Sequence, residues 1–448
     1  MRAPGWRGRA FVGLALAGLC LGAAGPSRGD EESSPATSLS LREVLRSAEH
    51  DPPSVRAALA AVTRVDAQRG YAEAAYLPSL TGQVTGGASY DNQLLVPDTP
   101  RIDSTSLTVQ GTAALDWSLL NAERGSKLDA ARADLQGQRF AAEEARRAAM
   151  QAAAELYVRA QAAAALVDDA LLTVERRTNQ GHAVRDLVKA GVHPPVDGVR
   201  AEVELEKARH ALVARQIGAR AAVAALAVAI GRDPTSIVKP EGNDTDALEV
   251  ALPPARARDE ASRNRPELRR LVASVGSRRA DYDAAVGARL PTVGVSATGT
   301  ASYAHVLAGL GIDGAVYEGT AVAYVRWGAL DPAVWGRAPV AEAATDEAKR
   351  DLEEAQASIA AEAVAAAYAA DLARNEVDRA AAVLEGAGAI REAQNERYRA
   401  GVGSLVELLD AEALEQEARV ERIVSRRDYQ IAGARLLSTC GLLARLAR

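Results

Sequence analysis

The chain repeats itself once, and this internal duplication constrains its fold more than any other feature. Residues 77–80 (LPSL) match 290–293 (LPTV) at an offset of 213, and residues 190–192 (AGV) match 400–402 (AGV) at an offset of 210. The change of three residues falls within 78–117, where a surface loop would absorb it. Matches on both sides of one loop indicate two copies of one structural unit, so an expectation for one half of the chain also applies to the other half.

The duplication predicts two structural repeats, at residues 30–232 and 258–448, joined by a linker or equatorial segment at 233–257 that is rich in Pro, Asp, Gly and Thr. Each repeat is expected to contain a helix, two strands, a long helix and a shorter helix, in that order. The strands are expected at 79–90, 104–117, 291–303 and 316–327, the long helices at 121–190 and 333–400, and the shorter helices at 196–230 and 405–440.

The helix that opens the first repeat is expected over residues 40–76. Ser40 and Glu43 have the spacing of a capping box, and apolar residues follow at helical spacing. Pro78 ends this helix. The long helices are rich in alanine and would each reach roughly 100 Å at 1.5 Å per residue. Such a composition is typical of coiled-coil walls in which backbones approach closely.

The four predicted strands alternate between apolar and polar side chains. In the second strand, Leu107, Leu115 and Trp117 lie on one face, and Thr108, Gln110 and Asp116 lie on the other. An alternation of this kind over about ten residues is a weak signature of a membrane β-barrel. Aromatic residues lie at the strand ends, where an interfacial belt would place them. They are Trp117, Trp327, Tyr90 and Tyr303.

The N-terminus has the pattern of a signal peptide over residues 1–29: arginines, then an apolar run at 10–24, then small residues. The run is shorter than the ~20 residues of a spanning helix. Removal of residues 1–29 takes away four arginines and no acid, so the net charge of −6 becomes more negative and disfavours nucleic-acid binding. No later stretch is expected to span a membrane as a helix, so a membrane location would require a barrel.

The sequence offers few candidates for catalytic or metal-binding chemistry. Once the signal peptide with Cys20 is removed, Cys440 is the single cysteine, which excludes an intramolecular disulfide and favours a buried thiol on a helix. The five histidines show no metal-ligand spacing. The sequence has no P-loop, dinucleotide-binding glycine pattern or nucleophile elbow. We therefore expect neither an enzyme nor a bound metal or cofactor.

With these elements in order, the chain resembles the TolC family of outer membrane efflux proteins over about residues 38–443. Residues 41–45, 77–80 and 117–120 carry the resemblance, and the strongest stretch is 397–412 (RYRAGVGSLVELLDAE). The resemblance implies an α+β membrane protein that assembles as a homotrimer. Four strands per protomer would form a shared 12-stranded β-barrel, and the long helices an α-helical barrel in the periplasm. Four strands cannot close a barrel alone, and open strand edges cannot face lipid, so physics also favours oligomers.

The sequence departs from the family pattern at two kinds of turn. Leu120 and Leu330 stand where the family commonly has phenylalanine, and the glycine-rich turn that follows is absent. We expect Asn121 and Asp331 to cap the following helices instead. The turn after the first long helix contains residues 193–195 (HPP), which leaves adaptor choice open.

The resemblance places a gate where the long helices turn back, and implies that Glu407 and Asp410 face the pore. Three copies would make rings of like charge that attract cations. Alternatively, both are solvated first-turn acids favoured by the helix dipole. Asp197 aligns with Glu407 as a further candidate. Glycines are expected to end the long helices in left-handed geometry, and the tip there to contact an adaptor. The tip residues are Gly191, Val192, Gly401, Val402 and Leu405.

These features predict an outer membrane channel that serves as the exit duct of a tripartite efflux system. Its partners would be a periplasmic adaptor protein, an inner-membrane pump or ABC-type transporter, and outer membrane lipid. One alternative is the duct of a type I protein secretion system, which shares the architecture. A second is a soluble periplasmic coiled-coil scaffold, which would have no use for four amphipathic strands.

Overall fold

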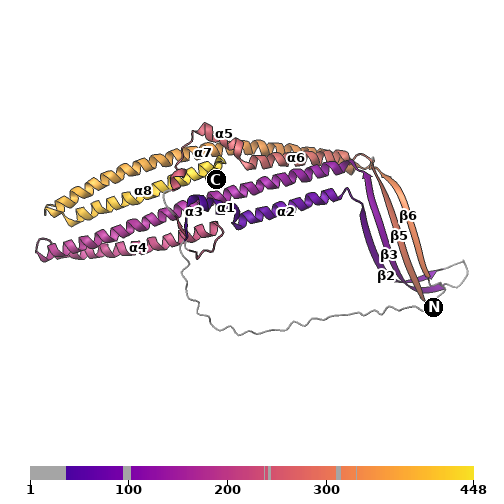
Figure 1. The fold of residues 1–448 in the computed structure, drawn as a ribbon, viewed down its shortest axis with the longest axis horizontal. Helices are drawn as coiled ribbons and strands as arrows, with labels where there is room; N and C mark the ends of the chain where they lie inside the picture. Colours follow the sequence, from indigo (N-terminus) through magenta and orange to yellow (C-terminus); the bar gives the residue numbers. More distant parts are fainter. Residues whose placement is uncertain are drawn as a thin grey trace, which may run out of the picture. The chain divides into compact units, whose positions relative to one another are not determined.

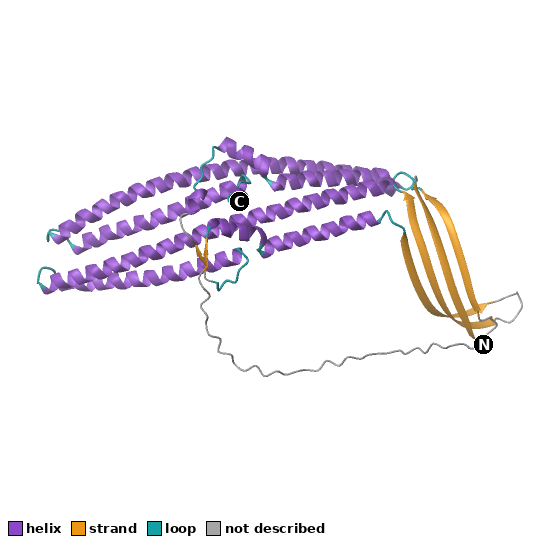
Figure 2. Cartoon of the chain, in the orientation of Figure 1, coloured by secondary structure: helices purple, strands orange, loops and turns teal. Residues whose placement is uncertain are grey.

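The computed structural model describes residues 37–93, 102–236, 238–240, 244–308, 314–328 and 330–447. The predicted signal peptide at 1–29 lies outside these residues. The described chain is mostly helical and contains one four-stranded sheet (Figures 1 and 2).

The elements of the first half are β1 (Thr37–Leu39), α1 (Leu41–His50), α2 (Pro53–Ala74), β2 (Ser79–Gln93), β3 (Ile102–Leu120), α3 (Ala122–Lys189) and α4 (Pro195–Ala229). Those that follow are β4 (Val238–Pro240), the 3-10 helix η1 (Asp244–Leu248), α5 (Pro254–Asn264), α6 (Pro266–Gly287), β5 (Thr292–Ala308), β6 (Gly314–Arg326), α7 (Pro332–Arg399), α8 (Leu405–Thr439) and the 3-10 helix η2 (Leu443–Arg445). Corresponding helices have equal lengths: 22 residues in α2 and α6, 68 in α3 and α7, and 35 in α4 and α8.

The helix expected over residues 40–76 is in fact two helices. The capping box at its start is present, because Ser40 Oγ accepts a hydrogen bond from the Glu43 amide and Glu43 Oε2 accepts one from the Ser40 amide. The helix breaks at Pro52, which has an extended backbone (φ −60°, ψ 143°) and cannot donate a backbone hydrogen bond. Between α5 and α6 the extended residue is Arg265 (φ −68°, ψ 121°), and Pro266 is the first residue of α6. Helix α5 begins inside the segment assigned to the linker.

The four-stranded sheet is antiparallel throughout, with strand order β2-β3-β5-β6. The hydrogen-bonded register aligns Leu80 with Leu115, Leu115 with Ala297, and Ala297 with Ala321. Because alternate residues share a face, most apolar positions of the four strands lie on one side of the sheet, whereas Val316 and Val322 of β6 lie on the other. Within the described residues, β2 and β6 each pair on one side only and are the sheet edges.

The two short strands were not predicted. Strand β1 pairs in parallel with β4, which belongs to the predicted linker. This pairing and η1 give the segment between the repeats an ordered structure against the helices.

The junctions between strands and helices are built alike in the two halves. Trp117 Nε1 donates to the Tyr76 carbonyl at 3.2 Å, and Trp327 Nε1 donates to the Arg289 carbonyl at 2.9 Å. The predicted caps are confirmed. Asn121 Oδ1 accepts from the amide two residues on at 3.0 Å, and the Asp331 carboxylate does the same at 2.9 Å.

Helix α7 continues through Pro339, although proline has no amide to donate to the carbonyl four residues before it. That carbonyl belongs to Trp335, and Arg289 Nη2 donates to it at 3.3 Å. The Arg289 guanidinium also lies 4.7 Å from the centre of the Trp335 ring. A side chain two residues after the end of α6 therefore replaces the hydrogen bond that the proline removes.

The largest buried cluster joins α1, α3, α4 and η1 with the C-terminal part of α8. Tyr157 is fully buried there, and its hydroxyl donates to the Leu39 carbonyl at 3.2 Å. A second cluster joins α5, α7 and α8 mainly through alanines, together with the buried Cys440. Small side chains let these helix backbones approach closely, in agreement with the low aromatic content of the sequence.

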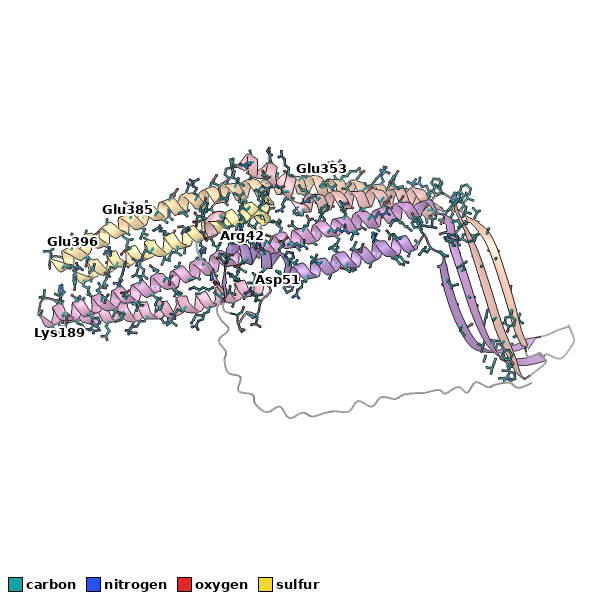
Figure 3. All side chains as sticks on the ribbon, viewed as in Figure 1. Arg42, Asp51, Lys189, Glu353, Glu385 and Glu396 are labelled. Atoms are coloured by element: carbon teal, nitrogen blue, oxygen red, sulfur yellow. The ribbon has the colours of Figure 1, made fainter. Side chains whose placement is uncertain are left out.

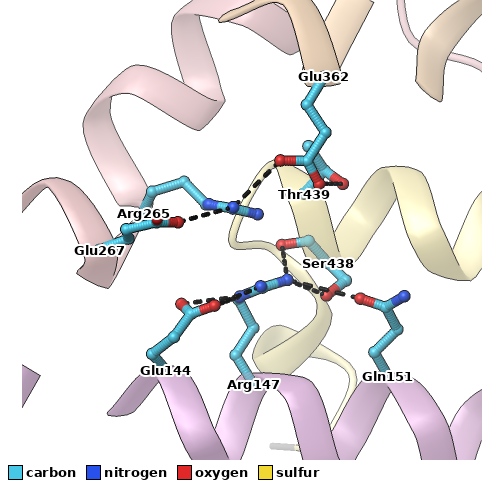
Figure 4. A network of polar contacts seen from close by, with 8 residues as sticks. All are labelled: Glu144, Arg147, Gln151, Arg265, Glu267, Glu362, Ser438 and Thr439. Atoms are coloured by element: carbon cyan, nitrogen blue, oxygen red, sulfur yellow. Dashed lines mark hydrogen bonds and ion pairs between the residues drawn. The ribbon is translucent and has the colours of Figure 1, made fainter. Parts of the chain in front are cut away.

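A polar network ties the first repeat to the second where α3 passes the end of α8 (Figure 4). Arg147 on α3 donates to Glu144 Oε2 at 3.0 Å and to Ser438 Oγ at 2.6 Å. The buried Arg265 lies 3.1 Å from both Glu267 and Glu362. These contacts hold the centre of the helical body at the level of the α5–α6 break.

Candidate gate and helix turns

The two long helices end in the same backbone motif. Gly191 and Gly401 have φ values of +77° and +74°, as predicted for left-handed glycines after a helix. The next amides reach back to the helix: Val192 N–H donates to the Leu187 carbonyl at 3.0 Å, and Val402 N–H donates to the Arg397 carbonyl at 3.1 Å. Both turns lie at the same end of the helices, where Figure 3 labels Lys189 on α3 and Glu396 on α7.

The predicted tip residues differ in their exposure. Val192 and Val402 are 61% and 71% exposed. Leu405 is only 2% exposed, because it packs in a cluster with Val184 and Tyr398. The expectation that the Leu405 side chain lies on the contact surface of the tip is therefore wrong for the single protomer.

Glu407 and Asp410 are both exposed on the first turns of α8. Ser404 caps this helix, since its hydroxyl accepts a hydrogen bond from the Glu407 amide at 3.2 Å. Neither carboxylate belongs to an ion pair in the part of the chain that the structure describes. Both are available to face a pore or bulk water, and their assignment to a gate stays a prediction.

Asp197 lies in a different environment from Glu407, with which it aligns in sequence. It is 7% exposed, and its Oδ2 is 3.5 Å from His193 Nδ1. The His193 ring stacks on Tyr398 with 4.8 Å between centroids. Burial raises the pKa of the Tyr398 hydroxyl, and the charge of Asp197 adds to the rise. The turn at residues 193–195 thus packs against the last turn of α7, and the Asp197 carboxylate that follows it points into the protomer.

Sequence reasoning missed a buried ionic cluster next to these turns. Glu415 on α8 is 8% exposed and lies 2.8 Å from Arg391 Nε, 2.9 Å from Arg419 Nη1 and 3.4 Å from Arg176 Nη1. Arg419 Nε also binds Asp169 at 2.8 Å. The members come from α3, α7 and α8, so positions distant in sequence meet here.

A second ion pair, between Arg177 and Glu412, lies beside this cluster. Burial raises the pKa of Glu412, although the charge of Arg177 opposes the rise. The only sign of these ion pairs in the sequence was the helical spacing of charged residues, and a solvent-exposed helix face has the same spacing.

The four predicted belt aromatics are exposed on the sheet. Trp117 and Trp327 lie at the end of the sheet that joins the helices, where their indoles bind the preceding turns. Tyr90 pairs with Thr105 near the other end of β3, and Tyr303 pairs with Val109. The side chains therefore lie in two groups along the strands.

The described residues contain no group of three or more His, Cys, Asp or Glu that could hold a metal ion. One described helix, α4, is long and apolar enough to cross a membrane by length and composition. The expectation that no helix after the signal peptide meets this criterion is therefore wrong. Only 11% of its most apolar window is buried, because Val213 and Ile217 face away from α3.

The chain matches the model of the outer membrane efflux protein family over residues 44–232 and 257–442. No curated protein matches it. Its fold is similar to a membrane protein from Pseudomonas aeruginosa (22% identity, 90% of this chain, 92% of the other, TM-score 0.73). It is also similar to CusC (18% identity, 90% of this chain, 92% of the other, TM-score 0.71). A third similar structure is the open-state MtrE channel of Neisseria gonorrhoeae (21% identity, 90% of this chain, 89% of the other, TM-score 0.68). The chain therefore belongs to the outer membrane efflux protein family and is a protein of the cell outer membrane with a helical body in the periplasm.

Proposed function

We propose that three copies of this chain form the exit duct of a tripartite efflux system. Each copy, an internally duplicated chain, contributes four strands to a 12-stranded barrel in the outer membrane. The helices of the three copies continue the duct through the periplasm towards an adaptor protein and an inner-membrane pump. The duct performs no catalysis, and a gate at the α3–α4 and α7–α8 turns controls it.

The observation that carries this proposal is the sheet. Most of its apolar positions share one face and most of its polar positions share the other, and both faces are largely exposed in the protomer. Strands β2 and β6 have unpaired edges within the described chain. Backbone groups on such edges cannot be left in lipid. If β6 of one copy pairs with β2 of the next, three copies bury every edge and turn the apolar face to lipid.

The aromatic residues support a membrane-spanning sheet of the right height. Trp117 lies on β3, and Tyr90 pairs with Thr105 of the same strand. At about 3.3 Å per residue the two levels are roughly 40 Å apart along the strand. A strand tilt of about 40° reduces this to roughly 30 Å along the membrane normal, close to the thickness of the hydrocarbon core.

The exposed apolar face of α4 fits the same assembly. Val199, Val203, Val213 and Ile217 are each about half exposed or more. Helix α4 packs along α3 but carries these residues on its outer side. In a ring of helices, this side would pack against the next copy. The apolar residues of α4 therefore serve subunit contact and not membrane insertion.

The gate is tested by neutralising its acids. Glu407→Gln with Asp410→Asn is expected to raise single-channel conductance in planar bilayers and to weaken the preference for cations, because rings of three negative charges are removed. The matched control is Glu396→Gln, an exposed acid near the end of α7 (Figure 3). We expect the control to conduct like the wild type. Unchanged conductance and selectivity in the double variant would remove these residues from the gate.

A further inference from the structure

A polar cavity of about 420 Å³ lies between α3, α7 and α8, next to the turns that end α3 and α7. At about 30 Å³ per water molecule, it has room for a small ion with several waters. Its lining contains five arginines and two glutamates. These are Arg176, Arg177, Arg391, Arg399, Arg419, Glu412 and Glu415. With Asp169 counted through its contact with Arg419, two positive charges are still in excess.

The carboxylates of the cavity are already shared. Glu415 is in contact with three arginines, and Glu412 holds Arg177, whose side chain is 9% exposed. Buried charges are costly unless they are paired. Arg419 also binds Asp169, but Arg176 and Arg391 have only the shared Glu415 carboxylate, so positive charge is left without a partner inside the protomer.

One buried polar atom in this lining, Tyr398 Oη, has neither a hydrogen-bond nor an ion-pair partner among the described residues. Arg391 Nε and Arg419 Nη1 lie 2.8 Å and 2.9 Å from the Glu415 carboxylate, which they share with Arg176. The arginine nitrogens can only donate, and the tyrosine hydroxyl can donate as well. Tyr398 is 5% exposed and lines the cavity, so its hydroxyl has no access to bulk water. The cavity therefore holds fewer carboxylates than guanidinium groups, and its buried hydroxyl has no acceptor.

We propose that this cavity binds a dianionic oxyanion of the size of sulfate or phosphate. Two excess positive charges match a dianion, and guanidinium groups bind such oxygens with paired, charge-assisted hydrogen bonds. The chain as a whole is acidic, with a formal net charge of −6, so its overall field repels anions. Saturable anion binding would therefore report this site. The inference does not depend on the proposed channel function.

The test is equilibrium dialysis of radiolabelled sulfate against the full-length protein in detergent, at constant ionic strength set with sodium chloride. We expect one saturable site per chain, competed by phosphate and at least about tenfold more weakly by acetate. Arg419→Gln should weaken binding by about tenfold or more, because it removes a charged donor. Arg350→Gln is the control, since Arg350 is exposed on α7 and pairs with Glu353 outside the cavity.

Two further variants keep the proposal testable if Arg419→Gln does not fold. Tyr398→Phe keeps the ring and removes only the unpartnered hydroxyl, so binding should weaken several-fold. Glu415→Gln removes the competing carboxylate, so binding should tighten, which a merely structural role would not produce. The proposal is overturned if the wild type shows no saturable sulfate binding, or if the folded variants bind sulfate like the wild type.

Discussion

Replacing Gly433 by alanine tests how closely η1 packs on α8. A Cβ at this position would lie 1.8 Å from the Leu248 carbonyl oxygen, where real Cβ atoms keep at least 3.0 Å. The backbone of η1 would have to move by more than 1 Å, and Leu248 is fully buried in the largest cluster. Overpacking of this kind costs about 1–3 kcal/mol, and alanine returns about 1 kcal/mol through its higher helix propensity. Because the clashing atom is a backbone oxygen, which cannot rotate away as a side chain can, we expect the upper part of this range, a net loss of about 1–2 kcal/mol.

The assay is denaturant unfolding of the purified protein, followed by helical circular dichroism. Gly388→Ala is the matched control, since Gly388 lies inside α7 and an added Cβ meets nothing within 4 Å. The control should gain about 0.5–1 kcal/mol because glycine is costly inside a helix. If Gly433→Ala is as stable as the wild type or more stable, the packing argument for η1 is refuted.

Three further predictions concern the helical body. Burial raises the pKa of the Cys440 thiol to about 11, so its alkylation by iodoacetamide at pH 8 should be far slower in the folded protein than after denaturation. Burial would raise the pKa of Glu155, but hydrogen bonds from Arg435 and Gln151 outweigh it and lower the pKa below 4.5. Its contribution to stability is therefore present above pH 4.5 and lost as the pH falls through the lowered pKa, and acid titration of Glu155→Gln should show a smaller loss than the wild type. Arg289→Ala should lower the free energy of unfolding by about 1 kcal/mol or more in the wild type. In a Pro339→Ala background the loss should be clearly smaller, because alanine at 339 supplies the missing amide. A double-mutant cycle measures this difference.

The sequence predicted the type and order of the main elements because their signals are local. Period-two alternation marked the strands, and the glycines after α3 and α7 marked the turns. The breaks before α2 and α6 were missed, since the helical spacing at residues 41–48 does not show where the helix ends, and proline is also common at the first position of a helix. A pattern of one side chain in every three or four shows a helical face but not whether the helix is interrupted.

What could not be predicted depends on contacts between distant positions. The pairing of β1 with β4 joins segments about 200 residues apart, and the contact of Asp169 with Arg419 joins positions 250 residues apart. Leu405 and Val402 are both apolar tip residues, but only the structure shows that one is buried and the other exposed. The burial of Asp197 likewise follows from His193 and Tyr398, which approach it from two different turns.

The central claim is that β6 of one copy pairs with β2 of the next, and disulfide cross-linking between these edges tests it most directly. In one chain the register links Gln83 to Glu318 through Thr112 and Thr300. Three strand spacings of about 4.8 Å put them roughly 14 Å apart, beyond the ~7 Å limit for a disulfide. A bond between these edges must therefore join two copies.

The experiment combines Gln83→Cys with Glu318→Cys, Thr320→Cys or Val322→Cys in turn, because the register between copies is to be found by scanning. After oxidation in outer membranes, non-reducing gels should show cross-linked species for at least one pair, in a ladder that ends at three copies. Only monomers in every pair, or a ladder that continues beyond three, would contradict a closed barrel of three chains.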